Sequence, residues 1–299
     1  MESKEFEIII IGGSYAGLSA AMALGRSIRK VLIIDSGLPC NSVTLHSHNF
    51  LTQDGETPYS ISLKAKDQLM KYPTVSFVSE LAIRGKKIDA GFEIETSSGN
   101  KYTSKKLIIA SGIKDDVSKI EGLEACWGKT IVHCPYCHGY EFREEITGIL
   151  ANSDAAYHYA QLIGNLTNKL KIFTNGKADF TSAQKENIAK HNIEIVEKEI
   201  QAFKHSDGNL IGIVFKDASF EELKALYYRP EFNQHCTIPE SLGAELNELG
   251  YLNIDDDNQT TVKGMYAIGD CSSAMRSVAN AVADGNKIGA KLNMEIIAW

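Results

Sequence analysis

The distribution of apolar residues along the chain predicts strands and helices in alternation, which is typical of an α/β protein. The first apolar run, Phe6–Ile11, is continuous, as expected for a buried parallel strand. A glycine-rich turn follows, then a helix predicted over 18–28, and then a second strand over Val31–Asp35 that ends in a carboxylate. This order of strand, tight turn, helix and strand with a terminal acid is the fingerprint of a dinucleotide-binding βαβ unit.

The remaining patterns predict one α/β domain that is interrupted by another. Alternating apolar residues predict strands at 75–78, 92–96 and 107–110, with turns at Gly91 and at 98–100. A second α/β segment carries predicted strands at 146–150, 170–173, 193–196 and 210–215, and helices near 154–163 and 181–191. The last sixty residues return to a strand at 264–268 and to a helix of small residues over about 276–297.

Composition narrows the functional classes. A chain of 299 residues with 43% hydrophobic and 23% charged residues has the composition of a globular protein of about two domains. Its net charge of −7 argues against a nucleic-acid partner. No apolar run approaches the roughly 18 residues that cross a bilayer, so no membrane partner is expected. The six cysteines, with no visible secretory signal, favour a reducing compartment, and we expect a cytoplasmic protein.

Several short motifs follow one another along the chain. They are Gly12–Gly17, Asp35, Ala110–Gly112, Cys134-Pro135-Tyr136-Cys137-His138, Tyr266–Asp270 and Arg276–Ala279. Together they resemble the low-molecular-weight thioredoxin reductase family over essentially the whole chain. The resemblance implies an α/β fold of two Rossmann-like (three-layer ββα) domains, the second inserted into the first. It implies an FAD-binding domain at 1–115 and 234–299, an inserted redox-disulfide and degenerate NAD(P)-binding-like domain at 116–233, and a homodimer.

The resemblance also implies which residues hold FAD. The first turn would bind the pyrophosphate and Asp35 the adenosine ribose, while Asp270 would contact the ribityl–phosphate region. Residues 276–278 would begin a helix that points at the isoalloxazine ring. Ser14 replaces the second glycine of the fingerprint, and because serine is small we expect FAD binding to survive. The full predicted set is Gly12, Ser14, Tyr15, Ala16, Gly17, Asp35, Ser36, Asn49, Ala110, Ser111, Gly112, Gly269, Asp270, Arg276, Ser277 and Val278.

The two cysteines of the CxxCH motif predict redox chemistry. Thiols three residues apart can close a reducible disulfide, and a helix that begins at the second cysteine would lower the pKa of its thiol. By resemblance, Cys137 faces the flavin, Cys134 exchanges with substrate, and His138 takes the place of the acid that shuttles the thiol proton. Imidazole suits proton transfer near pH 7.

Three other interpretations of this motif were weighed. CxxCH is formally a c-type haem attachment signature, but an apparent flavin fold surrounds it and no export signal precedes it. His133, Cys134, Cys137 and His138 could be imagined as a zinc site, although such contiguous residues can hardly close a tetrahedron, so no metal is predicted. The third interpretation is an inert, reduced pair in a noncatalytic protein.

The second domain departs from the family pattern where NADPH should bind. Its first strand runs into Ala151, Asn152 and Ser153, with none of the expected glycines, and its second into Thr174-Asn175-Gly176-Lys177, with one lysine in place of an arginine pair. A Cβ at the close-approach positions pushes a pyrophosphate away. NAD(P)H binding is therefore doubtful, with a relaxed NADH site as the alternative.

Three functions remain open. The first is a pyridine-nucleotide-independent, FAD-dependent thiol–disulfide oxidoreductase that acts on a thioredoxin-like protein or a small dithiol or disulfide, with ferredoxin as a possible donor. The second is a dithiol oxidase that passes electrons through FAD to O₂, because the CxxCH form also resembles enzymes that close disulfides in natural products. The third is a noncatalytic flavin-binding protein. For Trp299 two interpretations stand: it stacks on the flavin, or, as is more common for a chain end, it packs against a second subunit or is disordered.

Overall fold

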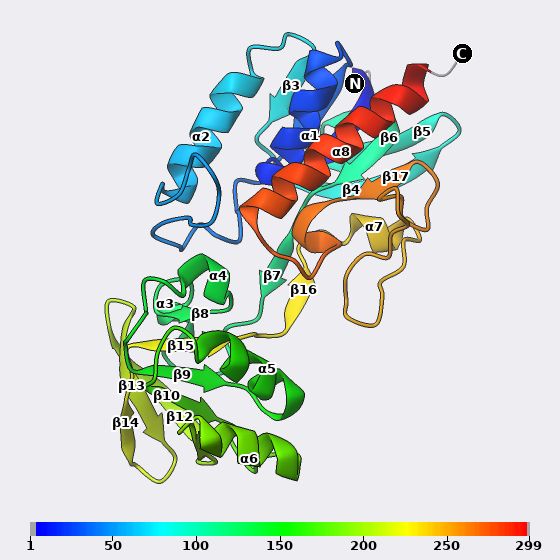
Figure 1. Cartoon of the computed structure of the whole chain (residues 1–299). Helices are drawn as coiled ribbons and strands as arrows, with labels where there is room; N and C mark the ends of the chain where they lie inside the picture. The colour runs from blue at the N-terminus through cyan, green and yellow to red at the C-terminus, as the bar shows by residue number, and fades with distance from the viewer. Residues whose placement is uncertain (1–3, 298–299) are drawn as a thin grey trace. The chain divides into compact units, whose positions relative to one another are not determined.

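The computed structural model describes residues 4–297, so Trp299 lies outside the described residues. The chain divides into two compact units, each with a sheet of its own (Figure 1). The first unit comprises 1–42, 58–114 and 232–299, and the second comprises 43–57 and 115–231. The chain thus leaves the first unit twice, and the short excursion at 43–57 packs with the long one.

The first unit is built on a sheet whose central strands are parallel. Its order is β3-β2-β1-β6-β5-β4, and β17 also pairs with β6. The buried runs of β1 and β2 align residue by residue, from Ile8 opposite Val31 to Ile11 opposite Ile34. The strands are β1 (Lys4–Ile11), β2 (Val31–Ile34), β3 (Val75–Val78), β4 (Ala82–Ile88), β5 (Gly91–Thr96), β6 (Lys101–Ile109) and β17 (Met265–Ala267).

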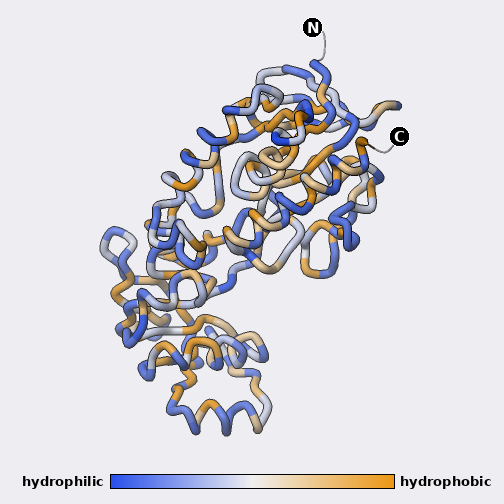
Figure 2. The backbone as a smooth tube through the Cα atoms, turned by 45° about the horizontal axis from the view of Figure 1, so that its top comes forward, coloured by the Kyte–Doolittle hydropathy of each residue, from blue (hydrophilic) through white to orange (hydrophobic). Residues whose placement is uncertain are grey.

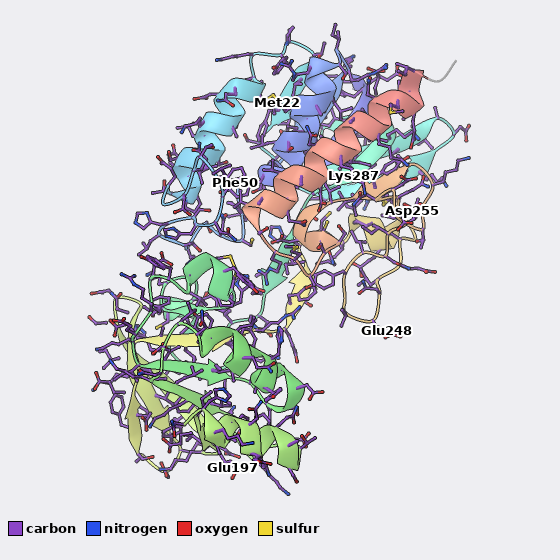
Figure 3. All side chains as sticks on the ribbon, in the orientation of Figure 1. Met22, Phe50, Glu197, Glu248, Asp255 and Lys287 are labelled. Atoms are coloured by element: carbon purple, nitrogen blue, oxygen red, sulfur yellow. A yellow bond between two sulfur atoms is a disulfide. The ribbon has the colours of Figure 1, made fainter. Side chains whose placement is uncertain are left out.

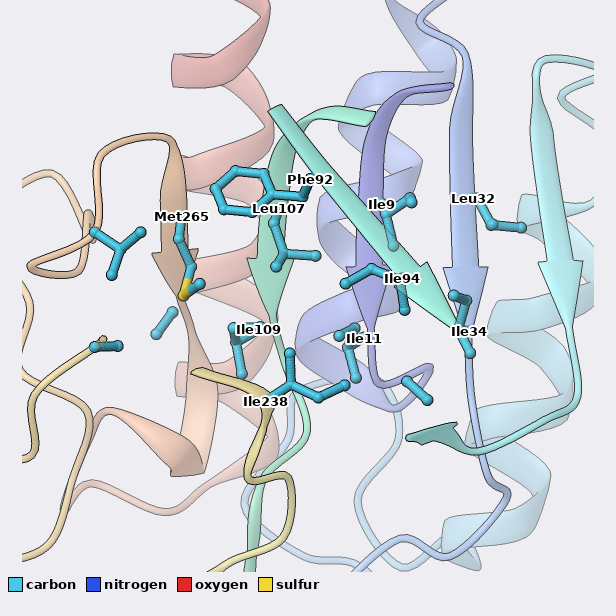
Figure 4. Close-up of a cluster of buried hydrophobic side chains, with 14 of the residues drawn as sticks. Ile9, Ile11, Leu32, Ile34, Phe92, Ile94, Leu107, Ile109, Ile238 and Met265 are labelled. Atoms are coloured by element: carbon cyan, nitrogen blue, oxygen red, sulfur yellow. The ribbon is translucent and has the colours of Figure 1, made fainter. Parts of the chain in front are cut away.

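One face of this sheet is covered by its own antiparallel extension. β4 and β5 form a hairpin that pairs with the start of β6, and Phe92 and Ile94 of β5 point into a core shared with the parallel strands. Figure 4 shows these two side chains beside Ile9, Leu107 and other residues of the sheet. Burial of this apolar surface is the main stabilising contribution of the layer.

Helices cover the other face: α1 (Tyr15–Arg26), α2 (Pro58–Leu69) and α8 (Val278–Ile297). α1 and α8 approach closely because small residues line their contact. A Cβ on Gly285 of α8 would collide with the Ala16 carbonyl of α1, so only glycine fits there. The two long helices are thereby held side by side (Figure 1).

The second unit has a parallel sheet of order β11-β10-β9-β15-β8 and a separate antiparallel sheet β12-β13-β14. Its parallel strands are β8 (Ile131–Val132), β9 (Thr147–Leu150), β10 (Leu170–Phe173), β11 (Glu194–Val196) and β15 (Ala225–Tyr228). The antiparallel strands are β12 (Ile200–Ser206), β13 (Asn209–Phe215) and β14 (Phe220–Glu222). The helices are α3 (Leu123–Cys126), α4 (Pro135–His138), α5 (Ser153–Ile163) and α6 (Ser182–Lys190).

Strands also pair where the chain passes between the units. β7 (Ile113–Asp115) and β16 (Phe232–Gln234) form a two-stranded sheet, and α7 (Ile238–Ser241) and the 3₁₀ helix η1 (Gly269–Cys271) complete the elements. Within residues 4–297 no helix is long and apolar enough to cross a membrane, and the hydropathy along the tube in Figure 2 changes over short stretches. The predicted α/β fold with Rossmann-like parallel sheets is confirmed.

Candidate active site

In the first unit, the predicted cofactor residues gather at one edge of the parallel sheet. β1, β2, β6 and β17 run in the same direction, so their carboxyl ends meet there. Each of the four strands is followed directly by a predicted motif, respectively Gly12, Asp35, Ala110 and the Ile268–Asp270 turn. Ligands of open α/β sheets bind outside the carboxyl ends of the strands, so this edge is the candidate cofactor site.

The glycines of the first turn are required by close backbone contacts. Gly12 has φ 107°, and a Cβ there would collide with the Ala110 carbonyl. A Cβ on Gly17 would collide in turn with the Gly12 carbonyl. Ser14 is the N-cap of α1, and its side chain makes no capping hydrogen bond. The first turn of α1 therefore presents backbone N–H groups and a hydroxyl at the edge of the sheet.

Polar groups from the other two motifs complete this edge. The Ser111 Oγ atom is buried and has no hydrogen-bond partner among the described residues. The Arg276 Nε atom lies 3.6 Å from the Asp270 carboxylate, and both side chains are largely buried. The Ser277 hydroxyl accepts a hydrogen bond of 3.1 Å from the Asn280 amide, which caps α8 as it begins at Val278.

A hydrogen bond also fixes the turn that follows β2, where Asp35 lies. The Asp35 carboxylate accepts a hydrogen bond of 3.0 Å from the Gly37 amide, which holds the turn that contains Ser36. Asn49, by contrast, belongs to the segment 43–57 of the second unit, where it has φ 59° and its amide donates to Asp54. Of the predicted FAD residues, Asn49 alone belongs to the second unit.

Cys134 and Cys137 form a disulfide in the second unit, with Cα atoms 5.3 Å apart (Figure 3). The short helix α4 begins at Pro135, so it starts between the two cysteines and not at the second one as expected. Cys134 is its N-cap, and its Sγ atom accepts a hydrogen bond of 3.2 Å from the Cys137 amide. Tyr136, between them, is 70% exposed, whereas the two cysteines are half-buried.

His138 follows the disulfide directly and is largely enclosed. Burial lowers the pKa of His138 below its ordinary value of 6.5, and the opposing effect of the Glu141 carboxylate is smaller. The imidazole is therefore neutral at pH 7 and able to accept a proton from a thiol. A histidine with such a shifted pKa beside a disulfide is the strongest catalytic signal in the second unit.

Two residues that act electrostatically on His138, Glu141 and His48, were not predicted from the sequence. The His48 Nε2 atom lies 3.5 Å from the Glu141 carboxylate, and the His48 Nδ1 atom lies 3.7 Å from Asp54. No spacing in the sequence links His48 to the CxxCH motif, so the sequence alone assigns it no role. Only the packing of segment 43–57 with the second unit brings it there.

The other histidine of the motif and the remaining cysteines have different surroundings. The His133 ring stacks on Trp127 with centroids 6.0 Å apart. Among residues 4–297 no group of three or more histidine, cysteine, aspartate or glutamate side chains is arranged to hold a metal ion. Burial raises the pKa of the Cys271 thiol to about 12, so this cysteine is protonated and unreactive.

Comparisons with known proteins give the same picture over almost the full length. The family model of pyridine nucleotide-disulphide oxidoreductases matches residues 6–285. The chain is 30% identical to thioredoxin reductase aclD of Aspergillus oryzae, over 96% of this chain and 95% of that protein. TrxB from Bacillus anthracis superposes with a TM-score of 0.92 at 28% identity, over 97% and 98% of the two chains. An oxidoreductase from Agrobacterium tumefaciens gives 0.91 at 34% identity, over 98% and 99%.

Enzymes of this family and type use FAD, in agreement with the predicted cofactor. The sheet edge of the first unit fits it, since the close backbone turn at Gly12 and the unpartnered Ser111 hydroxyl are features of a ligand cradle. The chain therefore belongs to the pyridine nucleotide-disulphide oxidoreductase family, as a flavin-dependent disulfide oxidoreductase of the thioredoxin reductase type.

Proposed function

We propose that this enzyme exchanges two electrons between FAD, the Cys134–Cys137 disulfide and an external thiol or disulfide, without help from NADPH. The observation that carries the proposal is the disulfide itself, which is followed directly by a half-buried histidine whose pKa is lowered by burial. FAD, when bound, supplies a two-electron acceptor or donor. The protein supplies the cysteine pair, the proton acceptor and the groups that hold the cofactor.

The cofactor-binding roles follow the geometry of the first unit. Backbone N–H groups at the start of α1, with the Ser14 hydroxyl, would hold the pyrophosphate. Asp35, at the end of β2, would accept the ribose hydroxyls. The Ser111 hydroxyl and the Asp270–Arg276 pair would contact the remainder of the cofactor.

In the second unit, each thiol–disulfide exchange needs a thiolate and a place for its proton. We assign Cys134 to the exchange with substrate and Cys137 to the exchange with the flavin. His138 accepts the proton that is released when a thiol ionises, and returns it when a thiolate becomes a leaving group. Because burial keeps His138 neutral, it can accept a proton over the whole range near pH 7.

The predicted loss of NADPH binding is supported by the N-terminus of α5, where a nucleotide pyrophosphate would have to dock. The side-chain Oδ1 atom of Asn152 already accepts hydrogen bonds from the backbone amides of Ser153 and Asp179, each of 2.9 Å. The Ser153 hydroxyl donates to the Asp179 carboxylate, and Asp154 lies in the same first turn. The Ser153 amide and hydroxyl, which could donate to a phosphate, are thus occupied, and the Asp154 and Asp179 carboxylates would repel it.

The turn after β10 is closed as well, although a 2′-phosphate would need it open. The Thr174 hydroxyl donates to the Gly176 carbonyl, and the Asn175 side chain accepts a hydrogen bond of 2.7 Å from the Ile200 amide. The Lys177 carbonyl accepts from the Asn152 side chain, which ties this turn to the start of α5. A single lysine here is a weak substitute for an arginine pair.

The substrate is proposed as a thioredoxin-like protein or a small dithiol or disulfide, since the relative aclD is named a thioredoxin reductase. A dithiol oxidase that passes electrons to O₂ is the second candidate, because the histidine after the disulfide suits the uptake of protons from a dithiol. A noncatalytic flavin protein is the least supported, since it gives the disulfide and His138 no role.

Anaerobic titration of the bound flavin separates these functions. NADH, NADPH, reduced ferredoxin and dithiothreitol are each added to the oxidised holoprotein while the flavin absorbance is followed. We expect bleaching by dithiothreitol and not by NADPH. Reoxidation in air with stoichiometric formation of peroxide would favour the oxidase, and a flavin that no reagent reduces would overturn the proposal.

A further inference from the structure

A cluster of titratable side chains lies in the same unit as the proposed proton acceptor, His138, and its members come from two segments far apart in the sequence. His138 and Glu141 lie on and just after α4, while His48 and Asp54 lie in the segment 43–57. Glu141 is in contact with His48 at 3.5 Å and acts electrostatically on His138, where it favours the charged imidazolium. His48, when protonated, acts on His138 in the opposite sense. The Glu141 carboxylate therefore interacts with two imidazoles, by contact with His48 and electrostatically with His138.

The segment that carries His48 is shaped to present it. The Ser47 amide donates to the Glu56 carbonyl over 2.8 Å, and the Gly55 amide donates back to the Ser47 carbonyl over 2.9 Å. The Asp54 carboxylate accepts a hydrogen bond of 2.7 Å from the Asn49 amide. These bonds fold residues 47–56 into a closed loop, so His48 is held in place beside Glu141 and is not a free surface side chain.

The three members of the cluster other than His138 differ in exposure. The His48 side chain is 22% exposed, that of Glu141 37% and that of Asp54 67%. Burial and, to a smaller extent, the Glu141 charge raise the pKa of the Tyr227 phenol of β15, so this group stays neutral. The Tyr227 hydroxyl is buried without a hydrogen-bond partner among residues 4–297. The charges that face His138 are thus those of Glu141, His48 and, more remotely, Asp54.

We propose that His138, Glu141 and His48 act as one proton-holding unit, in which Glu141 stabilises a single added proton on either imidazole and His48 exchanges it with solvent. The inference rests on the proposed role of His138 as proton acceptor. When a thiol of the pair ionises, its S–H bond breaks and an N–H bond forms on His138. Glu141 balances the new charge, and the proton leaves through His48 toward the exposed Asp54. Glu141 and His48 are positioning residues, because neither touches the sulfur atoms in the contacts described.

If both imidazoles share the Glu141 carboxylate, removal of Glu141 and removal of His48 should shift the His138 pKa in opposite directions. Glu141→Gln removes the charge that favours the His138 imidazolium, so the His138 pKa should fall. His48→Gln removes the second imidazole that Glu141 contacts, and with it the opposing effect of His48 on His138, so the His138 pKa should rise. A merely structural role would not shift the same pKa in opposite directions. We expect shifts of about half a pH unit or more, given the effect of a charge at such distances.

The test is a ¹⁵N-histidine NMR titration of the oxidised holoprotein, in which the His138 signals are identified by their loss in His138→Gln. Glu186→Gln is the matched control, because Glu186 forms an exposed ion pair with Lys190 on α6 and should leave His138 unchanged. Shifts of the same sign, or no shift in either variant, would overturn the inference. Glu141 is partly exposed, so Glu141→Gln should fold. The His138 pKa measured in His48→Gln is a second, independent test, because it should move in the opposite direction.

The proposed function is tested separately. If dithiothreitol failed to bleach the flavin, or if His138→Ala bleached as fast as the parent protein, the catalytic assignment would be wrong whatever the titration showed. If bleaching required His138 but its pKa were indifferent to Glu141 and His48, only the shared-proton inference would fail. With both correct, the acidic limb of the bleaching rate should shift down in Glu141→Gln and up in His48→Gln.

Discussion

The backbone amide of Cys137 donates a hydrogen bond of 3.2 Å to the Sγ atom of Cys134. The first cysteine of the pair therefore caps the short helix that carries the second. This contact makes the two sulfur atoms unequal before any substrate arrives. Cys134 belongs to the extended chain before α4, whereas Cys137 is fixed within the helix, which suits a mobile exchange partner and a stationary one.

The first prediction separates the roles of the two cysteines. Cys134→Ser should leave a Cys137 thiolate beside oxidised FAD and produce a long-wavelength charge-transfer band in the visible spectrum. Cys137→Ser should bind FAD equally well and show no such band. The reverse pattern would exchange the two assignments.

The second prediction concerns the proton acceptor. His138→Ala should reduce turnover with dithiothreitol by about 10²–10⁴-fold, as is typical for loss of a general acid–base group, while FAD stays bound. His158→Ala is the control, because that histidine is exposed on α5. A loss below about threefold, with chemistry rate-limiting, would make His138 a structural residue.

The pH dependence of the same reaction follows from burial of this histidine. A base with a lowered pKa remains unprotonated further into the acid range, so the acidic limb of the rate should lie below 6.5, the ordinary value for histidine. Stopped-flow rates of flavin bleaching between about pH 4.5 and 8 measure it. A limb above the ordinary histidine value would show that another group controls the step.

The third prediction addresses the glycine turn of the cofactor site. Gly17→Ala places a methyl group against the Gly12 carbonyl, a backbone atom that cannot move aside cheaply. The variant should purify with little FAD and unfold at a lower temperature. Ser14→Gly completes the dinucleotide fingerprint and should retain FAD. Equal flavin content in the two variants, measured by absorbance after denaturation, would contradict the proposed cradle.

The fourth prediction is that NADPH does not reduce the flavin efficiently. The Asn152 side chain lies where its pyrophosphate would bind, and the Asp179 carboxylate adds a negative charge there. Anaerobic stopped-flow mixing with stoichiometric NADPH should leave the oxidised flavin spectrum unchanged for minutes. Bleaching within a second would show that the second unit still binds the nucleotide.

The fifth prediction is a homodimer, as the resemblance to thioredoxin reductases implied. Light scattering at micromolar concentration should give twice the chain mass of 32.8 kDa. A species of one chain mass would contradict it, and dilution would distinguish a weak dimer from a stable one.

The sequence predicted those parts of the structure that are set by local patterns. Continuous apolar runs identified β1 and β2, and the glycine turn located the edge at which their carboxyl ends meet. The predicted start of the first helix at Leu18 was late, because the turn residues from Tyr15 onward already form its first turn. The helix α2 and the strand β4 were not predicted, since their exposed faces dilute the apolar pattern.

The surroundings of the disulfide could not be predicted in the same way. His48 and Glu141 are far apart in the sequence, and neither belongs to a motif whose spacing suggests contact. Their pairing depends on the fold of segment 43–57, which departs from the first unit and packs with the second. Electrostatic partners of this kind are set by tertiary structure, so they become visible only when the chain is seen in three dimensions.

The sheet of the first unit has a further consequence for the growing polypeptide. β1 and β17 both hydrogen-bond to β6, so strands from near the two ends of the chain complete one sheet. During synthesis the second unit is finished once residue 231 emerges from the ribosome, whereas the first must wait for β17 and α8. Since domains generally fold as units, the disulfide-bearing unit is expected to fold first. We therefore expect the flavin to bind late, after β17 and α8 have completed the first unit.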